Sequence, residues 1–294
     1  SLPCSLRSRR KIVGFLFTLP AVLYFGVVYF YPFLTSVLMS FYDWSPLGTK
    51  FIGINAYQAV LSDPTFWHTV KNSLYLMCLS VPGTVILALI FAVFLYSIKS
   101  DRSRHTFNII YLLPYVVSLI AASLIWQWLF DPNYGVLNYF LGLVGLPKLG
   151  WLTSESQVIP SISLVNIWLR LGFNVTILLS GLQTIPTDFY EAAMIDGASN
   201  TKIFFKITLP LLNPQIILVT INELIFAAKS FDQIYATTQG GPANASRVIM
   251  LYLYDTAFKW FHFGKASVVA VFFCLFLLLI SIMQWLFLRK KVEY

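Results

Sequence analysis

Six long apolar blocks divide this sequence, each close to the length of about 20 residues that crosses a bilayer as a helix. The blocks lack the alternation of apolar and polar residues that a membrane β-barrel requires. Only 11% of the residues are charged, about half the fraction that is usual in a soluble domain. We therefore predict an all-α, polytopic membrane protein. Its six spans are expected at 12–38, 70–98, 106–130, 158–182, 214–235 and 266–288.

The distribution of Lys and Arg predicts the orientation of these spans. Twelve of these 20 residues fall in the two tails or in the loops after the second and fourth spans, whereas six fall in the other loops. Cytoplasmic segments carry the excess of basic residues, so both termini are expected in the cytoplasm. The tails are predicted at 1–11 and 289–294, on either side of a transmembrane domain at 12–288.

The net charge of +8 does not indicate a nucleic-acid partner, because most basic residues cluster at the ends of the apolar blocks. The three cysteines, Cys4, Cys78 and Cys274, have neither the spacing of metal ligands nor that of a disulfide framework. We therefore expect the lipid bilayer as a partner, and neither nucleic acid nor a metal ion as a ligand.

A polar stretch at 191–210, EAAMIDGASNTKIFFKITLP, separates the fourth and fifth apolar blocks. Asp188 is a suitable N-cap for a first helix, and Glu191 can return a bond to the cap amide. Gly197 is the natural C-terminal stop of that helix. A helix followed by a sharp turn is therefore predicted on the cytoplasmic side.

The second half of this stretch predicts another helix. Ser199 or Asn200 can cap it, and Pro210 is expected to end it. The physical pattern alone leaves two interpretations open. The hairpin is either an amphipathic connector on the membrane surface or a docking element that inserts into a soluble partner.

The spacing of this hairpin resembles in full the EAA loop of ABC importer permeases. In that family the loop forms a coupling helix, which lies in a groove of the cytoplasmic ATPase subunit. The resemblance therefore implies a coupling loop at 186–212. Its motif residues in this sequence are Glu191, Ala192, Ala193, Gly197, Ile207, Leu209 and Pro210.

Further segments are similar to the carbohydrate-importer branch of that family, which includes the lactose, glycerol-3-phosphate and maltose permeases. They are LPAVLYFGVVYFYPFLTSVLMSFYDW, FIGINAY, LQTIPTDFYEAAMIDGAS and IYATTQGGP. The resemblance implies a type I ABC importer permease fold. It also implies ATP-driven, binding-protein-dependent import of a sugar or sugar-like solute across the plasma (inner) membrane. Ser246 departs from the Thr that relatives often have at this position.

The resemblance also implies the partners of this chain. They are a second, non-identical permease, two cytoplasmic ABC ATPase subunits and an extracytoplasmic solute-binding protein. No G-x-x-x-x-G-K-[ST] phosphate loop occurs in the sequence, and GGPANAS at 240–246 lacks the lysine. We therefore expect a transport subunit that is not an enzyme and carries no cofactor, with ATP and Mg²⁺ on the ATPase chains.

Polar residues inside the fourth and fifth spans are candidates for the solute path, because such residues are costly in a membrane. Asn166, Arg170 and Asn174 are spaced by four and share one helix face. The fifth span contributes Asn222, Glu223, Lys229 and Ser230. The structural alternative is that Arg170 and Glu223 form an ion pair, with the asparagines bonding between helices.

The family resemblance supports the solute path. Counted from Glu191 without gaps, the sugar-contacting positions of the maltose permease fall on Arg170, Phe173, Glu223, Phe226, Ala227 and Ser230. Ala227 replaces an amide residue there, which implies a different solute or a different pose. The outer turn at Gly240, Gly241 and Pro242 is implied to contact the binding protein or to form part of the closed gate.

Two other classes of function remain as alternatives. A secondary transporter driven by an ion gradient would use the buried charges as a relay, and it would show inverted repeats and transport by this chain alone. A membrane enzyme would require nucleophiles, acids or metal ligands that converge at a membrane face. We find neither pattern in the sequence.

Overall fold

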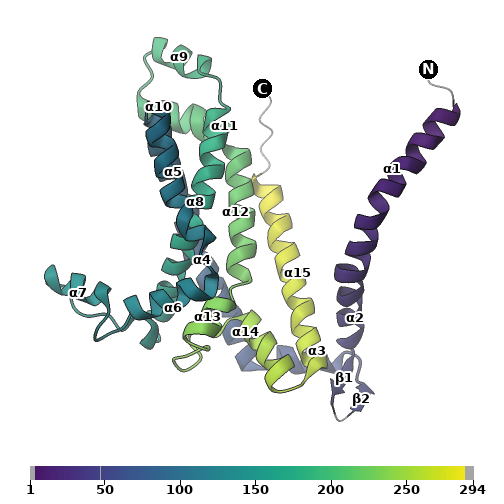
Figure 1. Cartoon of the computed structure of the whole chain (residues 1–294). Coiled ribbons are helices and arrows are strands. Elements are labelled where there is room, and N and C mark those ends of the chain that lie inside the picture. The colour runs from purple at the N-terminus through teal and green to yellow at the C-terminus, as the bar shows by residue number, and fades with distance from the viewer. Residues whose placement is uncertain (1–3, 47, 289–294) are drawn as a thin grey trace. The chain divides into compact units, whose positions relative to one another are not determined.

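The computed structural model describes residues 4–46 and 48–288, which form helices apart from one short hairpin of strands (Figure 1). The predicted C-terminal tail, 289–294, and the first three residues of the predicted N-terminal tail lie outside the described residues. Contacts divide the chain into two compact units. One comprises the chain up to Asp63 together with Leu253–Cys274, and the other comprises Pro64–Tyr252 with the chain after Cys274.

The first unit contains the N-terminal span. Helix α1 (Cys4–Phe25), a π-helical turn η1 (Gly26–Phe30) and α2 (Tyr31–Met39) follow one another directly. The described apolar span runs from Val13 to Met39, close to the prediction of 12–38. The remaining elements of this unit are α3 (Asn55–Leu61), the last residues of α14 (Ile249–Tyr254), η4 (Asp255–Lys259) and the first half of α15 (Phe263–Leu288).

The exception to the all-α prediction is an antiparallel pair, β1 (Tyr42–Ser45) and β2 (Gly48–Phe51), at the end of α2 (Figure 1). Aromatic residues favour strands, and the rings of Tyr42 and Phe51 contact each other across the pair at 5.2 Å. Helix α15 approaches this hairpin closely at Gly264, where an added Cβ would lie 1.9 Å from the Tyr42 carbonyl oxygen.

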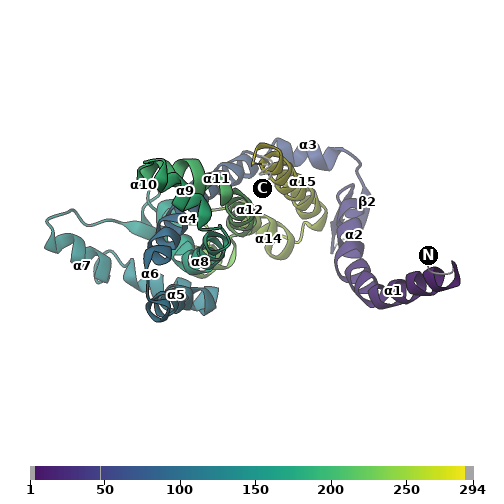
Figure 2. The same cartoon turned by 90° about the horizontal axis from the view of Figure 1, so that it is seen from above.

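The second unit is a helix bundle in which α4 (Pro64–Ser97) and α5 (Asp101–Val116) pack along α8 (Val158–Gln183) (Figure 2). Helix α12 (Asn213–Ala228) packs against both α4 and α8. Apolar residues from these helices form the core. Its fully buried members include Ala88, Ala92, Leu95, Val175, Leu178, Leu212 and Val219.

Helix α4 is continuous through Pro82, although a proline lacks one helix hydrogen bond. Neighbouring helices in a bundle compensate for such prolines. The next residue, Gly83, lies so close to α8 that an added Cβ would be 2.6 Å from a methyl group of Ile167. The tight contact therefore depends on the absence of a side chain at this position.

The third predicted span is bent, and the fifth begins directly after a bend. Helices α5 and α6 (Leu119–Leu129) meet at 95°, three residues after Pro114. The segment Asn200–Leu211 meets Asn213–Thr237 at 66°. Four unbroken helices and these two bent pairs account for the six predicted spans, if each bent pair is one span. The second unit also contains α7 (Val136–Leu143), the 3-10 turn η2 (Trp151–Thr153) and α13 (Asp232–Thr237).

The polar hairpin lies at one end of the α4, α8 and α12 bundle, and α6 and α13 lie at the opposite end (Figure 1). Its elements are α9 (Asp188–Ile195), α10 (Asn200–Ile203), a π-helical turn η3 (Phe204–Thr208) and α11 (Leu209–Leu211). The bundle therefore separates the hairpin from α6 and α13.

Candidate functional site

A buried ion pair joins the fourth and fifth spans. Arg170 lies on α8 and Glu223 on α12, and Arg170 Nε donates to Glu223 Oε1 at 2.8 Å. Their side chains are only 11% and 3% exposed, respectively. Because burying a charge removes its hydration, each of these charges depends on the other and on its remaining hydrogen bonds. The structural alternative considered from the sequence, an ion pair between these residues, is thus present.

Asn174 completes this cluster from the same face of α8. Its Nδ2 donates to Glu223 Oε1 at 2.8 Å and to the Arg170 carbonyl oxygen at 2.9 Å. The side chain is fully buried, yet its Oδ1 has no hydrogen-bond partner among the described residues. An unsatisfied buried acceptor costs about 1–3 kcal/mol. This oxygen therefore retains an unused acceptor site.

Three aromatic rings surround the Arg170 guanidinium. Its Cζ lies 4.6 Å from the ring centroid of Phe226, 5.0 Å from that of Phe173 and 5.3 Å from that of Tyr115. Aromatic faces attract cations at about this distance. The rings of Tyr115 and Phe173 are stacked at 4.7 Å. The site thus combines a cation, a carboxylate, an amide and flat apolar faces.

Sequence reasoning missed Tyr115, which α5 contributes. It is 41% exposed and therefore lies at the accessible side of the cluster. Its position directly after Pro114, in the middle of a predicted span, was the available signal. Like the asparagines of the fourth span, its hydroxyl is a polar group in an otherwise apolar segment.

A second polar cluster connects α8 with the end of the fifth span. Asn166 Nδ2 donates to Ser230 Oγ at 3.3 Å. Gln233 Nε2 donates to Asn166 Oδ1 and, at 3.3 Å, to Ser230 Oγ. All three side chains are buried. Sequence reasoning missed Gln233, although an amide inside the predicted span 214–235 could have indicated it.

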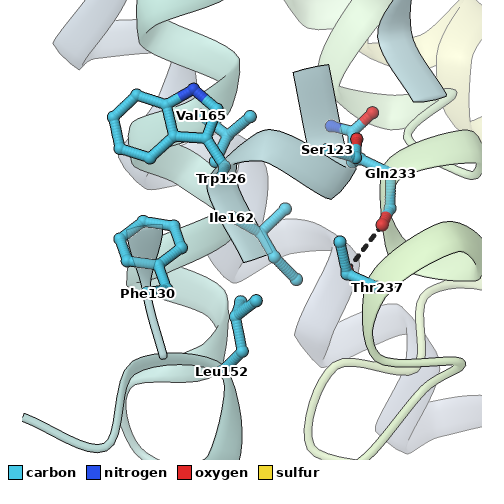
Figure 3. Close-up of a pocket in the computed structure, with 8 residues that line it drawn as sticks. All are labelled: Ser123, Trp126, Phe130, Leu152, Ile162, Val165, Gln233 and Thr237. Atoms are coloured by element: carbon cyan, nitrogen blue, oxygen red, sulfur yellow. Dashed lines mark hydrogen bonds between the residues drawn. The ribbon is translucent and has the colours of Figure 1, made fainter. Parts of the chain in front are cut away.

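Gln233 also lines a small cavity of about 10 Å³, which is room for one water molecule. Figure 3 shows the rings of Trp126 and Phe130 on one side of this cavity and Gln233 and Thr237 on the other. Thr237 Oγ1 donates to the Gln233 carbonyl oxygen at 2.6 Å. In this conformation the cavity has no room for a sugar-sized solute.

The other predicted path residues have different positions. Ala227 is buried in α12, at 2% exposure. Asn222 is half-buried and takes no part in the hydrogen bonds of either cluster. It directly precedes Glu223, so it lies about 100° around the helix from that carboxylate. The structure therefore groups Asn166, Arg170, Phe173, Asn174, Glu223, Phe226 and Ser230 along one seam, without Asn222.

The polar hairpin has the predicted first helix and the predicted stop. Gly197 has φ +71°, a conformation that favours glycine. The amide of Ala198 donates to the Ala193 carbonyl at 2.9 Å, and that of Gly197 to the Met194 carbonyl at 3.0 Å. This pair of bonds is a Schellman motif, which satisfies carbonyls at a helix end.

The prediction that Asp188 caps this helix is wrong. Thr187 occupies the N-cap position, and its side chain makes no capping bond. Helix α9 begins one residue earlier than predicted, so Asp188 is its first helical residue. Thr187 has a helical backbone, and a side-chain cap requires an extended N-cap residue. Asp188 and Glu191 instead place two carboxylates in the first turn, where they complement the helix dipole.

The second helix is capped by Ser199, as predicted, with Oγ accepting from the Lys202 amide at 3.4 Å. The prediction that Pro210 ends this helix is wrong, because the helical segment continues to Leu211. Pro210 lies in the first turn of α11, directly after the π-helical turn η3, where a missing amide donor is tolerated. Thr208 Oγ1 bonds Tyr190 OH at 3.4 Å and links the two halves of the hairpin.

Apolar side chains of the hairpin are exposed. Ile195 is 86% exposed, Met194 58% and Phe205 59%. The motif residues Glu191 and Ala192 are exposed as well. Adjacent apolar residues exposed in a polar segment mark a protein or membrane contact surface.

The turn at 240–242 lies at the opposite end of the bundle. Gly240 has φ +92°, and an added Cβ would be 3.1 Å from Leu251 Cδ2. Ser246 is fully buried, and its Oγ lies 2.6 Å from the Gly241 carbonyl oxygen and 2.8 Å from Thr238 Oγ1. A threonine hydroxyl can make the same bonds, so the departure at Ser246 preserves the chemistry of the turn.

Apolar spans, a buried polar seam and an exposed helical hairpin together define a polytopic membrane protein of the solute-translocating class. A comparison with protein families identifies the class more closely. The chain belongs to the family described as "Binding-protein-dependent transport system inner membrane component", whose model matches residues 65–292. It is therefore an inner membrane component of a transport system and a permease subunit.

Relatives named as sugar permeases cover most or nearly all of the chain. The lactose transport system permease protein LacF of Rhizobium radiobacter is 32% identical over 98% of this chain and 97% of its own length. The sulfoquinovosyl glycerol transport system permease protein SmoG of Agrobacterium fabrum is 33% identical, over 89% of this chain and 85% of its own length.

The fold is also known from a solved structure. A bacterial ABC transporter involved in the import of the acidic polysaccharide alginate contains a chain that matches with a TM-score of 0.84. The match has 23% sequence identity and covers 97% of this chain and 98% of that chain. The predicted type I ABC importer permease fold is therefore confirmed.

Proposed function

We propose that this chain is one of two non-identical permease subunits of an ATP-driven importer for a sugar or sugar-like solute. The relatives named above act on lactose and sulfoquinovosyl glycerol, and a third, 33% identical, is the trehalose/maltose permease protein MalF of Thermococcus litoralis. An oligosaccharide, a polyol glycoside or glycerol phosphate is the proposed range of solutes.

The observation that carries this proposal is the seam around Arg170 and Glu223. Sugar hydroxyls both donate and accept hydrogen bonds, and Glu223 and the free Oδ1 of Asn174 can accept while Arg170 donates. The faces of Tyr115, Phe173 and Phe226 can pack on the apolar side of a sugar ring. Asn166 and Ser230 extend the same seam, and Ala227, one turn after Glu223 on α12, contributes only a small side chain.

The hairpin 186–212 is the proposed joint to a cytoplasmic ATPase. Its exposed apolar residues and its glycine-dependent turn offer a preformed surface to a groove. ATP and Mg²⁺ are proposed to act on two ATPase chains, and this chain carries neither. Movement of the ATPase pair then changes the contacts of the joint, and the spans respond by opening on one side or the other.

The proposed orientation places both termini and the hairpin in the cytoplasm of a cell bounded by this inner membrane. The turn at Gly240, Gly241 and Pro242 then faces outward, where a solute-binding protein delivers the solute. A second permease completes the solute path on the side that this chain leaves open.

The test is reconstitution of the complete transporter in proteoliposomes, with the ATPase pair and the second permease. Uptake of a labelled sugar should require ATP inside, on the hairpin side, and the solute-binding protein outside. Uptake by this chain alone, driven by a proton or sodium gradient, would instead support the secondary transporter. Hydrolysis of ATP by the isolated chain would refute the assignment of ATP chemistry to partners.

A further inference from the structure

The outer turn and the end of the third span border an open cavity of about 410 Å³, within the usual range for binding pockets. Three segments line it: the end of α6 with the turn that follows, the turn η2, and the end of α13 with the outer turn. Their polar and backbone contributions come from Gln127, Asp131, Thr153, Thr237, Thr238 and Gly241.

The wall formed by the end of α6 is held in place by hydrogen bonds. Asp131 Oδ1 accepts from the amides of Asn133 at 2.8 Å and Tyr134 at 2.9 Å. The Asp131 carbonyl accepts from the Gly135 amide at 2.9 Å. An added Cβ at Gly135 would lie 2.3 Å from that carbonyl oxygen, so the turn requires glycine here.

The opposite wall is equally constrained. The Gly241 amide donates to the Thr238 carbonyl at 2.8 Å, and Ser246 Oγ holds the Gly241 carbonyl at 2.6 Å. On α4, Asn72 Nδ2 donates to the carbonyls of Asn244 at 3.1 Å and Arg247 at 3.0 Å. The loop that borders the cavity is therefore attached to the bundle, and the cavity exists before any partner binds.

The charge of the cavity is negative. None of the described residues that line it is Lys, Arg or His. Both amide bonds to Asp131 are made to Oδ1, and among the described residues nothing donates to Oδ2. The backbone amides of Tyr134 and Asn133 lower the pKa of Asp131, so the carboxylate is ionised at neutral pH.

We propose that this cavity is a docking socket for a Lys or Arg side chain of the extracytoplasmic solute-binding protein. A fixed carboxylate with one free oxygen, beside neutral hydroxyl, amide and carbonyl oxygens, matches a cationic donor. A sugar fits less well, because the ring that lines this cavity, Phe130, is only 1% exposed and presents no face for stacking. The identity of the partner rests on the proposed function.

The test uses the complete reconstituted transporter and its cognate solute-binding protein. The readout is the binding-protein concentration that gives half-maximal ATPase stimulation, measured at low and at physiological salt. Asp131→Asn is the variant of choice, since the amide oxygen of Asn can still accept from the two backbone amides. Glu155→Gln is the matched control, because Glu155 is an exposed carboxylate near η2 that does not line the cavity.

We expect Asp131→Asn to raise the half-saturating concentration about tenfold and to weaken its dependence on salt, because loss of one charge contact removes about that much affinity. Glu155→Gln should leave both unchanged. If both variants had the same half-saturating concentration of binding protein, the proposed docking socket would be wrong. The proposal would also fail if the only change were in the solute concentration that gives half-maximal uptake, measured at saturating binding protein. That result would indicate that the cavity binds the solute. If the unaltered transporter shows no stimulation at all, the proposed function itself fails.

Discussion

Arg170 Nε and Glu223 Oε1 lie 2.8 Å apart inside the bundle and connect α8 to α12. These two residues are the charged members of the polar seam, and each is nearly inaccessible to water. An ion pair in this position can stabilise the helix contact, bind solute or do both. The predictions below begin with variants that separate these roles.

Removing either charge should abolish uptake. Breaking a buried pair costs about 3–5 kcal/mol, because the remaining charge is left without its partner. Arg170→Ala and Glu223→Ala should therefore lower the thermal stability of the assembled transporter and abolish its uptake. The double variant Arg170→Met with Glu223→Leu should recover most of the stability and none of the uptake.

The control is Lys148→Gln, which removes an exposed charge in the loop between α7 and η2. It should behave like the unaltered protein in both assays. If the double variant recovers uptake with unchanged solute preference, the pair is purely structural and the seam is not the solute path.

Gly197 should be required for coupling. Its φ of +71° costs about 1–2 kcal/mol for most residues and more for a β-branched one. Gly197→Val should uncouple ATP hydrolysis from uptake, and so should Glu191→Lys, which reverses a charge in the first turn of α9. The measurement is the ratio of solute transported to ATP hydrolysed in proteoliposomes.

Gly197→Asn is the matched variant, because asparagine tolerates positive φ better than other residues with a side chain. Coupling that survives in Gly197→Asn and fails in Gly197→Val identifies the turn conformation as the requirement. Loss of coupling in both variants would indicate that the hairpin surface at residue 197 contacts its partner too closely for any side chain. Normal coupling in Gly197→Val and in Glu191→Lys would refute the joint.

Gly172 should be essential for the packing of α5 on α8. A Cβ at this position would lie 1.8 Å from the Tyr111 carbonyl oxygen, which is backbone and cannot rotate away. Gly172→Ala should therefore separate the two helices and destabilise the assembled complex by about 1–3 kcal/mol. Gly142→Ala in α7 is the control, since nothing lies within 4 Å of its added Cβ. Equal melting temperatures in the two variants would contradict the tight contact.

Gln233 should stabilise the second cluster. Gln233→Ala leaves Asn166 Oδ1 and Ser230 Oγ with one donor fewer in a buried site, at a cost of about 1–3 kcal/mol. Thermal unfolding of the assembled complex measures the loss. Gln183→Ala, at the exposed end of α8, removes a similar side chain and should have little effect. A loss of the same size at Gln183 would mean that the cluster adds no stability of its own.

Local sequence patterns were sufficient for the spans and for much of the hairpin. The length of each apolar block predicts a span, because a helix must cover the hydrocarbon core with apolar side chains. Gly197 indicated its own turn, since few other residues adopt positive φ without strain. The N-cap of α9 was less predictable. Thr187 has a helical backbone, and its conformation depends on the surrounding chain and not on its own residue type.

Contacts between distant segments were beyond local patterns. The four-residue spacing of Asn166, Arg170 and Asn174 predicts a shared face, and it does not specify which helix that face meets. The addition of Tyr115 from α5 to this seam depends on how α5 and α8 pack, which a glycine at 172 permits.

The sequence by itself determined the number of apolar blocks, their predicted orientation and the hairpin between the fourth and fifth, because these follow from local composition and backbone preference. Tertiary structure alone decided that Arg170 is paired with Glu223, that Asn174 retains a free oxygen and that Asp131 borders a cavity. The physical reason is that pairing, burial and cavities depend on side chains from helices far apart in the chain, and their packing fixes these relationships.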